Sequence, residues 1–324
     1  MDHRQTIIHH LEALRRRDFA GNDKWKVRAY DKVLKQLRAA STPITSMDDI
    51  SGYTGIGEKI RKKIEEILET GDLQQTHDLA EEVEAVDNLS KVFGIGPIRA
   101  RELFLQHGVK TVDELRLRQE LLNDKQKIGI KYVDDFAKRI PRSEMDKHAE
   151  MIVSAIKGLD AKWKVEIMGS YRRGTKDSGD IDVLVTHEDD PSGANQAALL
   201  AGIVANLQQQ KYLYDTLALG QKKYNGVCRL KRYKTYRRID IMYSTKNEFP
   251  FALLYFTGSQ EFNIELRARA LDRGFTMNEH GIKSKTDKVD STEFETEEDV
   301  FKFLGLRFVP PEQRAPNVMA TYLL

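Results

Sequence analysis

The hydrophobic pattern of the chain changes about halfway along its length. In the first third, apolar residues recur every three or four positions, the spacing that places them on one face of a helix. The apolar stripes are Ile7, Leu11 and Leu14; Val33, Leu34 and Leu37; and Ile60, Ile64, Ile67 and Leu68. Gly71 predicts the end of the third helix, because glycine readily adopts the left-handed conformation found at helix C-termini.

After about Asp160 the apolar residues gather in short runs rich in β-branched side chains, which predict strands. The predicted strands are 164–168, 181–186, 227–230 and 239–243. A helix is predicted at 195–210, between the second and third strands. A helical front followed by mixed strands and helices predicts a multidomain α + α/β fold.

One short motif occurs twice in the helical front. Gly55-Ile56-Gly57 recurs as Gly94-Ile95-Gly96, and each copy precedes an amphipathic helix. This pattern is typical of a helix-hairpin-helix element, in which glycines let the backbone approach a phosphate and the helix N-terminus offers N–H groups. The alternative is a pair of tight turns, but two copies followed by Lys59 and Arg99 favour DNA. We also hypothesise that Na⁺ or K⁺ binds the turn carbonyls.

Composition limits the class of protein but does not identify a partner. The 324 residues include 52 basic and 50 acidic side chains, so the net charge of +2 neither supports nor excludes DNA binding. Cys228 is the only cysteine, which excludes an intramolecular disulfide and favours a reducing compartment. No apolar run approaches the roughly 20 residues of a membrane span, and the first residues lack a signal-peptide core. We therefore expect a soluble intracellular protein.

Three carboxylates carry the strongest chemical signal. Asp180 and Asp182 are two residues apart at a predicted strand, so both point to one face, whereas Ile181 points to the core. Asp240 lies in a second predicted strand. Neighbouring like charges cost free energy unless a cation lies between them. Three carboxylates suit two Mg²⁺ ions about 4 Å apart, the arrangement used for phosphoryl transfer. For an isolated Asp-x-Asp alone, a solvated strand face would be the better interpretation.

The turn before these carboxylates suits a triphosphate. Gly169 allows close backbone approach, Ser170 offers a hydroxyl, and Arg173 neutralises developing charge. Together with the carboxylates, this turn predicts nucleotidyl transfer.

In order and content these motifs resemble those of the X-family DNA polymerases, particularly the beta-type members. The resemblance runs from about Thr6 to Pro311 and Glu312. Further motifs that carry it are Lys127-Ile128-Gly129-Ile130-Lys131-Tyr132, Arg139-Ile140-Pro141-Arg142, Arg238-Ile239-Asp240 and Tyr255-Phe256-Thr257-Gly258-Ser259. It implies four domains. These are a lyase and 5′-phosphate-binding domain at 1–78, a DNA-binding subdomain at 79–142, a catalytic palm at 143–248 and a nucleotide-selecting subdomain at 249–324.

The resemblance also assigns roles in the polymerase site. Asp180 and Asp182 would hold two Mg²⁺ ions, with Mn²⁺ as a substitute, and Asp240 would hold the catalytic ion and accept the primer proton. The residues implied to bind the incoming dNTP are Arg139, Gly169, Ser170, Arg173, Ser178, Gly179, Tyr255, Phe256, Gly258 and Asn263. The residues implied to bind DNA are Trp25, Lys26, Tyr30, Gly55, Gly57, Lys59, Gly94, Gly96, Arg238 and Arg267.

A second activity is implied for the front domain. The resemblance makes Lys63 the Schiff-base nucleophile of a 5′-deoxyribose-phosphate lyase, and nearby cations such as Lys59 would lower the pKa of its amine. An ordinary surface lysine is the alternative from the sequence alone. Ser51 stands where the beta-type enzymes carry a lysine, which predicts weaker phosphate binding.

We expect a template-directed repair polymerase that fills short gaps. The segment between Cys228 and Asp240 is short and basic, whereas template-independent relatives carry a longer insertion there. The expected partners are gapped or nicked DNA, dNTPs and repair proteins such as a ligase or AP endonuclease. The protein itself is expected to be a monomer, in the nucleus or wherever the DNA to be repaired resides. No BRCT module is expected before the first helix. A template-independent transferase and a catalytically silent DNA-binding scaffold remain the alternatives, and base-excision repair and end joining are both open.

Overall fold

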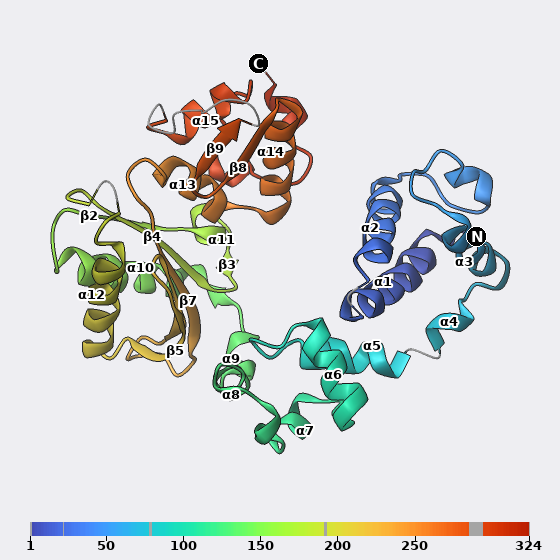
Figure 1. Cartoon of the computed structure of the whole chain (residues 1–324), viewed down its shortest axis with the longest axis horizontal. Helices are drawn as coiled ribbons and strands as arrows, with labels where there is room; N and C mark the ends of the chain where they lie inside the picture. Colours follow the sequence, from blue (N-terminus) through green and yellow to red (C-terminus); the bar gives the residue numbers. More distant parts are fainter. Residues whose placement is uncertain (1, 22, 78–79, 191–192, 285–293, 324) are drawn as a thin grey trace. The chain divides into compact units, whose positions relative to one another are not determined.

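The computed structural model describes residues 2–21, 23–77, 80–190, 193–284 and 294–323. Two compact units make up the chain, Met1–Val133 and Asp134–Leu324 (Figure 1). The predicted domain boundary at 78–79 lies outside the described residues. Among the described helices, none is both long and apolar enough to span a bilayer.

The first unit is helical throughout its described part. Its α-helices are α1 (Arg4–Ala20), α2 (Lys24–Ala39), α3 (Glu58–Thr70), α4 (Gln74–His77), α5 (Ala80–Leu89), α6 (Pro97–His107), α7 (Val112–Arg116) and α8 (Asp124–Lys131). Short 3₁₀ turns lie at Met47–Ile50 and Gln119–Leu121. The predicted apolar stripes of α1, α2 and α3 form one core, and Gly71 ends α3 with a φ of 77°, which confirms the predicted stop.

A second apolar cluster is built by α5 to α8. Val86, Leu103 and Ile130 are among its buried members. Gly129 of α8 lies so close to the backbone of Phe93 that an added Cβ would be 2.1 Å from the Phe93 carbonyl oxygen. Glycine at this position therefore permits α8 to pack directly against the second Gly-Ile-Gly turn, which follows Phe93.

A five-stranded sheet forms the centre of the second unit. Its strands are β2 (Trp163–Ile167), β4 (Ile181–His187), β5 (Leu213–Leu219), β6 (Lys223–Cys228) and β7 (Arg237–Tyr243). The order is β2-β4-β7-β6-β5, and only the β4–β7 pair is parallel. Helices α10 (Arg142–Lys157) and α12 (Gln196–Gln209) share the main core with the sheet. The predicted strands and the 195–210 helix are thus present, but the bounds predicted for the 227–230 strand are wrong.

The error at 227–230 has a physical cause. Strand β6 begins at Lys223 and alternates polar Lys223 and Asn225 with buried Tyr224 and Gly226, so its first half lacks the β-branched run that marks other strands. Strand β5 was not predicted, although it alternates buried Leu213 and Leu217 with exposed positions.

The rest of the second unit surrounds the sheet and forms a smaller C-terminal core. Near the start of the unit are α9 (Val133–Phe136), β1 (Ile140–Pro141), α11 (Gly169–Arg172) and β3 (Asp177–Ser178). The C-terminal elements are α13 (Phe249–Thr257), α14 (Gln260–Asp272), β8 (Phe275–Asn278), β9 (Gly281–Ser284), α15 (Glu297–Phe303) and 3₁₀ turns at Pro311–Gln313 and Met319–Tyr322. Helical and mixed units together confirm the predicted α + α/β class.

Candidate active site

Strand register brings the predicted carboxylates together. Asp182 of β4 pairs directly with Asp240 of β7, and Asp180 immediately precedes β4. Ile181, which alternates with the two β4-side carboxylates, is fully buried in the core. All three carboxylates therefore gather at the sheet face opposite the core, as predicted.

Because Asp182 is buried, ionising its carboxyl group without a bound cation costs free energy. Burial, followed by the nearby charges of Asp180 and Asp240, raises the pKa of Asp182 to about 8. A carboxylate with this environment is stabilised by a cation that replaces the proton. The donor set consists of carboxylate oxygens, which are the ligands that Mg²⁺ prefers.

Basic side chains face these carboxylates in the structure. Arg238 donates to Oδ2 of Asp180, and the Lys223 ammonium lies 3.5 Å from Oδ2 of Asp240. Asn225 donates to the other oxygen of Asp240 at 2.5 Å. Lys223 and Asn225 are not predicted as site residues from the sequence, because only the register of β6 against β7 places them beside Asp240.

The described residues do not contain a preformed cluster of three metal-ligating side chains. Asp180 forms an ion pair with Arg238. The chemistry of the three oxygen donors nevertheless fits divalent cations, because Asp182 is held next to two further carboxylates.

The Gly169 turn is shaped around Asp182. Gly169 has a φ of +61°, and a Cβ on it would lie 2.3 Å from Oδ2 of Asp182. Ser170 follows in α11 and donates to the hydroxyl of Ser178 at 2.9 Å. The glycine therefore lets the Ser170 turn pack closely against the carboxylate face.

A cavity of about 730 Å³ opens beside this turn. All the predicted dNTP-binding residues except Ser178 line it, together with Asp180, Asp182 and Arg267. Ser178 is buried behind Ser170. The volume of the cavity is within the range of small-molecule sites. Cationic groups and carboxylates both line its wall.

The C-terminal side of the cavity is held by contacts between predicted site residues. Arg173 donates to the carbonyl of Thr257, and Gly258 follows with a φ of +70°. Asn263 donates to the carbonyl of Tyr255 at 2.7 Å, while the Arg267 guanidinium lies 5.5 Å from the Tyr255 ring centroid. The aromatic and polar positions thus form one connected wall.

Other contacts within the cavity wall involve an aromatic pair and the approach of Arg139 to Gly179, all among the predicted dNTP-binding residues. Tyr255 and Phe256 have nearly parallel rings, with centroids 6.2 Å apart. Arg139 donates to the side chain of Asp177 at 2.9 Å, and a Cβ on Gly179 would be 2.9 Å from the Arg139 guanidinium.

A buried charge network joins the Ser170 turn to the C-terminal core. Arg172 donates to both oxygens of Glu297, and Arg314 donates to one of them at 2.7 Å. Burial opposes ionisation of Glu297, but the two arginines hold its pKa below the usual value. This network is not predicted from the sequence, since its members are far apart along the chain.

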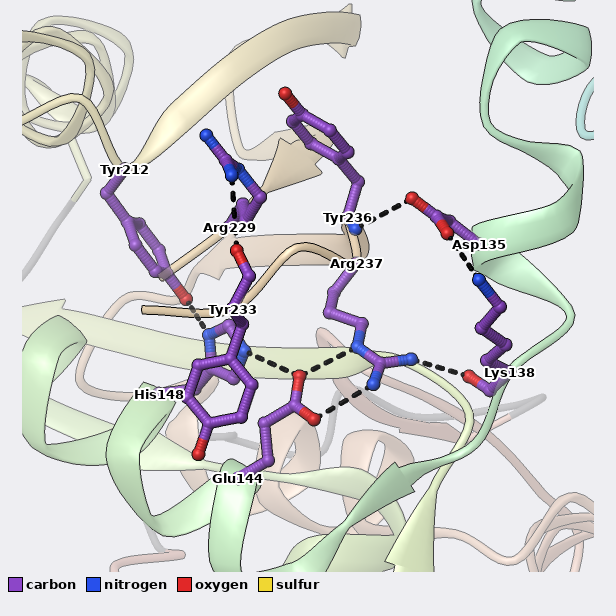
Figure 2. Close-up of polar contacts among 9 residues, drawn as sticks. All are labelled: Asp135, Lys138, Glu144, His148, Tyr212, Arg229, Tyr233, Tyr236 and Arg237. Carbon is purple, nitrogen blue, oxygen red and sulfur yellow. Dashed lines mark hydrogen bonds and ion pairs between the residues drawn. The ribbon is translucent and has the colours of Figure 1, made fainter. Parts of the chain in front are cut away.

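A second buried network anchors the start of strand β7 (Figure 2). Arg237 forms a two-bond ion pair with Glu144 of α10 at 2.8 and 2.9 Å and also donates to the carbonyl of Lys138. Asp135 accepts from the backbone N–H of Tyr236 at 3.0 Å. The segment just before α10 is therefore bonded to the strand that carries Arg238 and Asp240.

His148 completes this network in a neutral form. Burial lowers the pKa of His148 to about 4, and its Nδ1 lies 2.6 Å from the hydroxyl of Tyr212. Because the imidazole beside Glu144 is neutral, it is Arg237 that balances the negative charge of this carboxylate.

In the first unit, the predicted nucleophile Lys63 lies on α3, and its Nζ donates to the carbonyl of Lys59 at 3.2 Å. Burial and then the positive charge of Arg17 lower the pKa of Lys63. The direction agrees with the expectation, although burial rather than the neighbouring cations contributes most.

The other predicted DNA-binding side chains of this unit differ in exposure. Trp25 is 81% exposed, which suits stacking on a base, whereas Tyr30 is only 4% exposed and belongs to the core. Lys26 forms an ion pair with Asp23 at 2.8 Å. A phosphate contact by Tyr30 stays a prediction.

The two Gly-Ile-Gly turns have the same backbone conformation. Gly55 and Gly94 have φ values of +91° and +87°, and Gly57 and Gly96 cap α3 and α6. A Cβ on Gly57 or Gly96 would meet no atom within 4 Å, so the space in front of both helix N-termini is open within each turn.

Comparisons with known proteins agree with this organisation. Residues 2–73 match a helix-hairpin-helix domain, 87–137 the fingers domain of DNA polymerase lambda, 139–246 the DNA polymerase beta palm and 252–315 the DNA polymerase beta thumb. DNA polymerase lambda of Rattus norvegicus is 32% identical over 325 residues, which cover 95% of this chain and 56% of the relative. DNA polymerase lambda of Arabidopsis thaliana is 29% identical, covering 88% and 57%.

This chain thus spans about half the length of the curated relatives it matches. The family matches extend over both units, and the palm match includes Asp180, Asp182 and Asp240. The chain belongs to the X family of DNA polymerases.

Proposed function

We propose that this protein is a template-directed DNA polymerase that fills short gaps during DNA repair. The observation that carries the proposal is the pairing of Asp182 with Asp240 next to a cavity lined by Ser170 and Arg173. Family membership supports the same activity.

In the proposed reaction, the primer 3′-hydroxyl oxygen forms a bond to the α-phosphorus of a dNTP, and the bond to pyrophosphate breaks. Asp240 accepts the hydroxyl proton, while Ser170 and Arg173 hold the triphosphate. Asp180, Asp182 and Asp240 would hold two Mg²⁺ ions, or Mn²⁺. When bound, such ions stabilise the charge on the attacking and leaving oxygens.

Gap filling on a duplex with a one-nucleotide gap tests this proposal. With Mg²⁺ and dNTPs, the wild type is expected to extend a labelled primer by one nucleotide, whereas Asp240→Ala is not. Glu188→Ala, which removes an exposed carboxylate just after β4, is the matched control and should be fully active. Equal activity of Asp240→Ala and wild type would overturn the mechanism.

The same assay separates the alternatives. Extension of a single-stranded primer without a template would favour a template-independent transferase. DNA binding by a wild type that incorporates no nucleotide would favour the silent scaffold.

We also propose a 5′-deoxyribose-phosphate lyase in the first unit, supported by the lowered pKa of Lys63. Its amine would attack C1′ of the sugar aldehyde, and loss of water would give a Schiff base. β-Elimination would then break the C3′–O bond and leave a 5′-phosphate on the DNA end. Ser51 is exposed and its hydroxyl carries no charge, so unlike a lysine it supplies no cation to the phosphate.

Borohydride trapping on DNA with a 5′-sugar phosphate tests the lyase. The trapped adduct should disappear in Lys63→Ala and persist in Lys62→Ala, whose lysine is 71% exposed on the same helix. Because the pKa of Lys63 is lowered, the trapping rate should rise with pH and level off below the usual lysine pKa of about 10.4. A trap retained in Lys63→Ala would exclude Lys63 as the nucleophile.

The remaining assignments belong to the same proposal. We propose the domain division 1–78, 79–142, 143–248 and 249–324, with DNA held through backbone contacts at both Gly-Ile-Gly turns and with Na⁺ or K⁺ at their carbonyls. The protein would act as a monomer on gapped or nicked DNA, in the nucleus or wherever that DNA resides, with a ligase or AP endonuclease as neighbouring repair enzymes. The short, basic 229–238 segment supports dependence on a template.

A further inference from the structure

Asn225 belongs to a row of polar side chains that crosses the sheet. In the parallel β4–β7 pair Asp182 lies beside Asp240, and in the antiparallel β6–β7 pair Asn225 lies beside the same Asp240. Residues directly opposite each other in adjacent strands present their side chains to the same face, within contact distance. The row Asp182–Asp240–Asn225 is therefore a direct consequence of strand register.

The two oxygens of Asp240 have different partners. Oδ1 accepts from the amide of Asn225 at 2.5 Å, whereas Oδ2 lies 3.5 Å from the ammonium of Lys223. Only the NH₂ end of an asparagine can donate to a carboxylate, so this contact fixes the orientation of the amide. Lys223 lies two residues before Asn225 on β6 and shares its face.

This asymmetry constrains the Asp240 carboxylate. The Asn225 amide opposes rotation of the carboxylate about its terminal bond, because rotation would break the hydrogen bond. Oδ2 is then directed toward the Lys223 ammonium. A metal ion bound to Oδ2 would take the place of this cation. The side chain of Asp240 is only 20% exposed, so water competes poorly for these contacts.

We propose that Asn225 is a positioning residue for nucleotidyl transfer. By occupying Oδ1 of Asp240, it keeps Oδ2 available to a divalent cation and to the primer hydroxyl. The proposal rests on the polymerase function proposed above. Partners that orient metal-binding side chains typically change metal affinity or activity 10–100-fold when removed.

Kinetics of Asn225→Leu on the one-nucleotide gap test this role. Leucine has a similar size but no donor, so kcat should fall at least about tenfold. The KM for dNTP should stay within about twofold, since Asn225 does not line the nucleotide cavity. Asn225→Gln keeps the amide donor and should retain more activity than Asn225→Leu. A kcat within twofold of wild type for Asn225→Leu would overturn the proposal.

A metal-binding measurement separates this proposal from the polymerase function. Mn²⁺ titration followed by electron paramagnetic resonance would use enzyme, dNTP and gapped DNA with a dideoxy-terminated primer, so that no turnover occurs. Mn²⁺ should bind about tenfold more weakly to Asn225→Leu than to wild type. Equal Mn²⁺ affinities would overturn the role of Asn225 even if the wild type is an active polymerase. A wild type that binds Mn²⁺ but incorporates no nucleotide would instead overturn the polymerase function.

Controls distinguish positioning from loss of fold. Asn206→Leu removes a comparable amide, which donates to the carbonyl of Ala155 at 2.9 Å on the helical side of the sheet. This variant should keep the wild-type kcat and Mn²⁺ affinity. If Asn225→Leu unfolds, Asn225→Ala gives the same test with a smaller side chain, and thermal unfolding shows which variants are folded.

Discussion

Glycine turns begin helices in both units, but their surroundings differ. In front of α3 and α6, a Cβ on Gly57 or Gly96 would meet nothing within 4 Å, so each turn leaves room for an external group. At Gly169, the corresponding space is filled by the Asp182 carboxylate, 2.3 Å away. The first unit therefore leaves the backbone of these glycines exposed, whereas the second unit uses glycine to bring its own side chains together.

The largest expected effect comes from removing the charge that Gly169 packs against. Asp182→Asn should lower nucleotide incorporation at least about 10³-fold, because a ligand of the proposed metal ions loses its charge. Single-turnover gap filling measures this loss. Incorporation within tenfold of wild type would contradict the assigned role of Asp182.

The same variant should stabilise the metal-free protein at high pH. Because burial and the charges of Asp180 and Asp240 raise the pKa of Asp182 to about 8, the folded state keeps a proton that the unfolded chain loses near pH 4. Stability should therefore fall as pH rises from about 4 to about 8. At pH 8 with a chelator, Asp182→Asn should raise the free energy of unfolding by about 0.5–2 kcal/mol. Denaturant unfolding at pH 5 and pH 8 checks the sign.

Removing the Arg237–Glu144 ion pair at the start of β7 tests how far the stability of the second unit depends on internal contacts. Arg237→Met leaves Glu144 buried without its two-bond partner, which should cost about 3–5 kcal/mol of stability. The double variant Glu144→Met/Arg237→Met should recover most of this loss, since a buried pair can often be replaced by apolar side chains. Urea unfolding of both variants measures the difference. A single variant as stable as wild type would show that the pair does not hold the strand.

Gly169→Ala directly tests the close packing at the catalytic turn. The added methyl group would overlap the Asp182 oxygen, and the φ of +61° is strained for alanine. Incorporation should fall about 10²-fold, which is the scale expected for a misplaced reacting group. Gap-filling kinetics measure the loss, and an active Gly169→Ala enzyme would show that the turn can relax.

The smallest effects are expected at the open glycines. Gly57→Ala has an ordinary φ of −79°, so stability should change little. In the proposed DNA contact, the methyl group would occupy space beside the helix N-terminus that the phosphate approaches. DNA affinity should weaken about fivefold, which corresponds to one lost hydrogen bond. Gly202→Ala in α12 is the control, because it also meets no atom within 4 Å. That variant should keep its DNA affinity and gain up to about 1 kcal/mol of stability.

The difference between the units also explains which features could be predicted from the sequence. Gly55 and Gly57 act through local backbone conformation, so their role is visible in a few consecutive residues. Asp182 and Asp240 are 58 positions apart, and their contact depends on the β4–β7 register. Their motifs and the family resemblance identified them, whereas spacing alone would not have shown that they pair.

Residues without a motif were missed for the same reason. Asn225 and Lys223 contribute to the site only because β6 lies antiparallel to β7, and polar residues at those positions weakened the strand pattern itself. Glu297 meets Arg172 across 125 positions of sequence. Long-range register and packing, rather than local preference, decide these contacts.

The most direct test of the central claim is incorporation opposite each template base. Four one-nucleotide-gapped duplexes that differ only in the template base would each be offered the four dNTPs singly with Mg²⁺. The account predicts that the complementary dNTP is incorporated far faster than the other three on every duplex, and that Asp240→Ala incorporates none. Incorporation that ignores the template base, or its absence from all four duplexes, would contradict a template-directed polymerase.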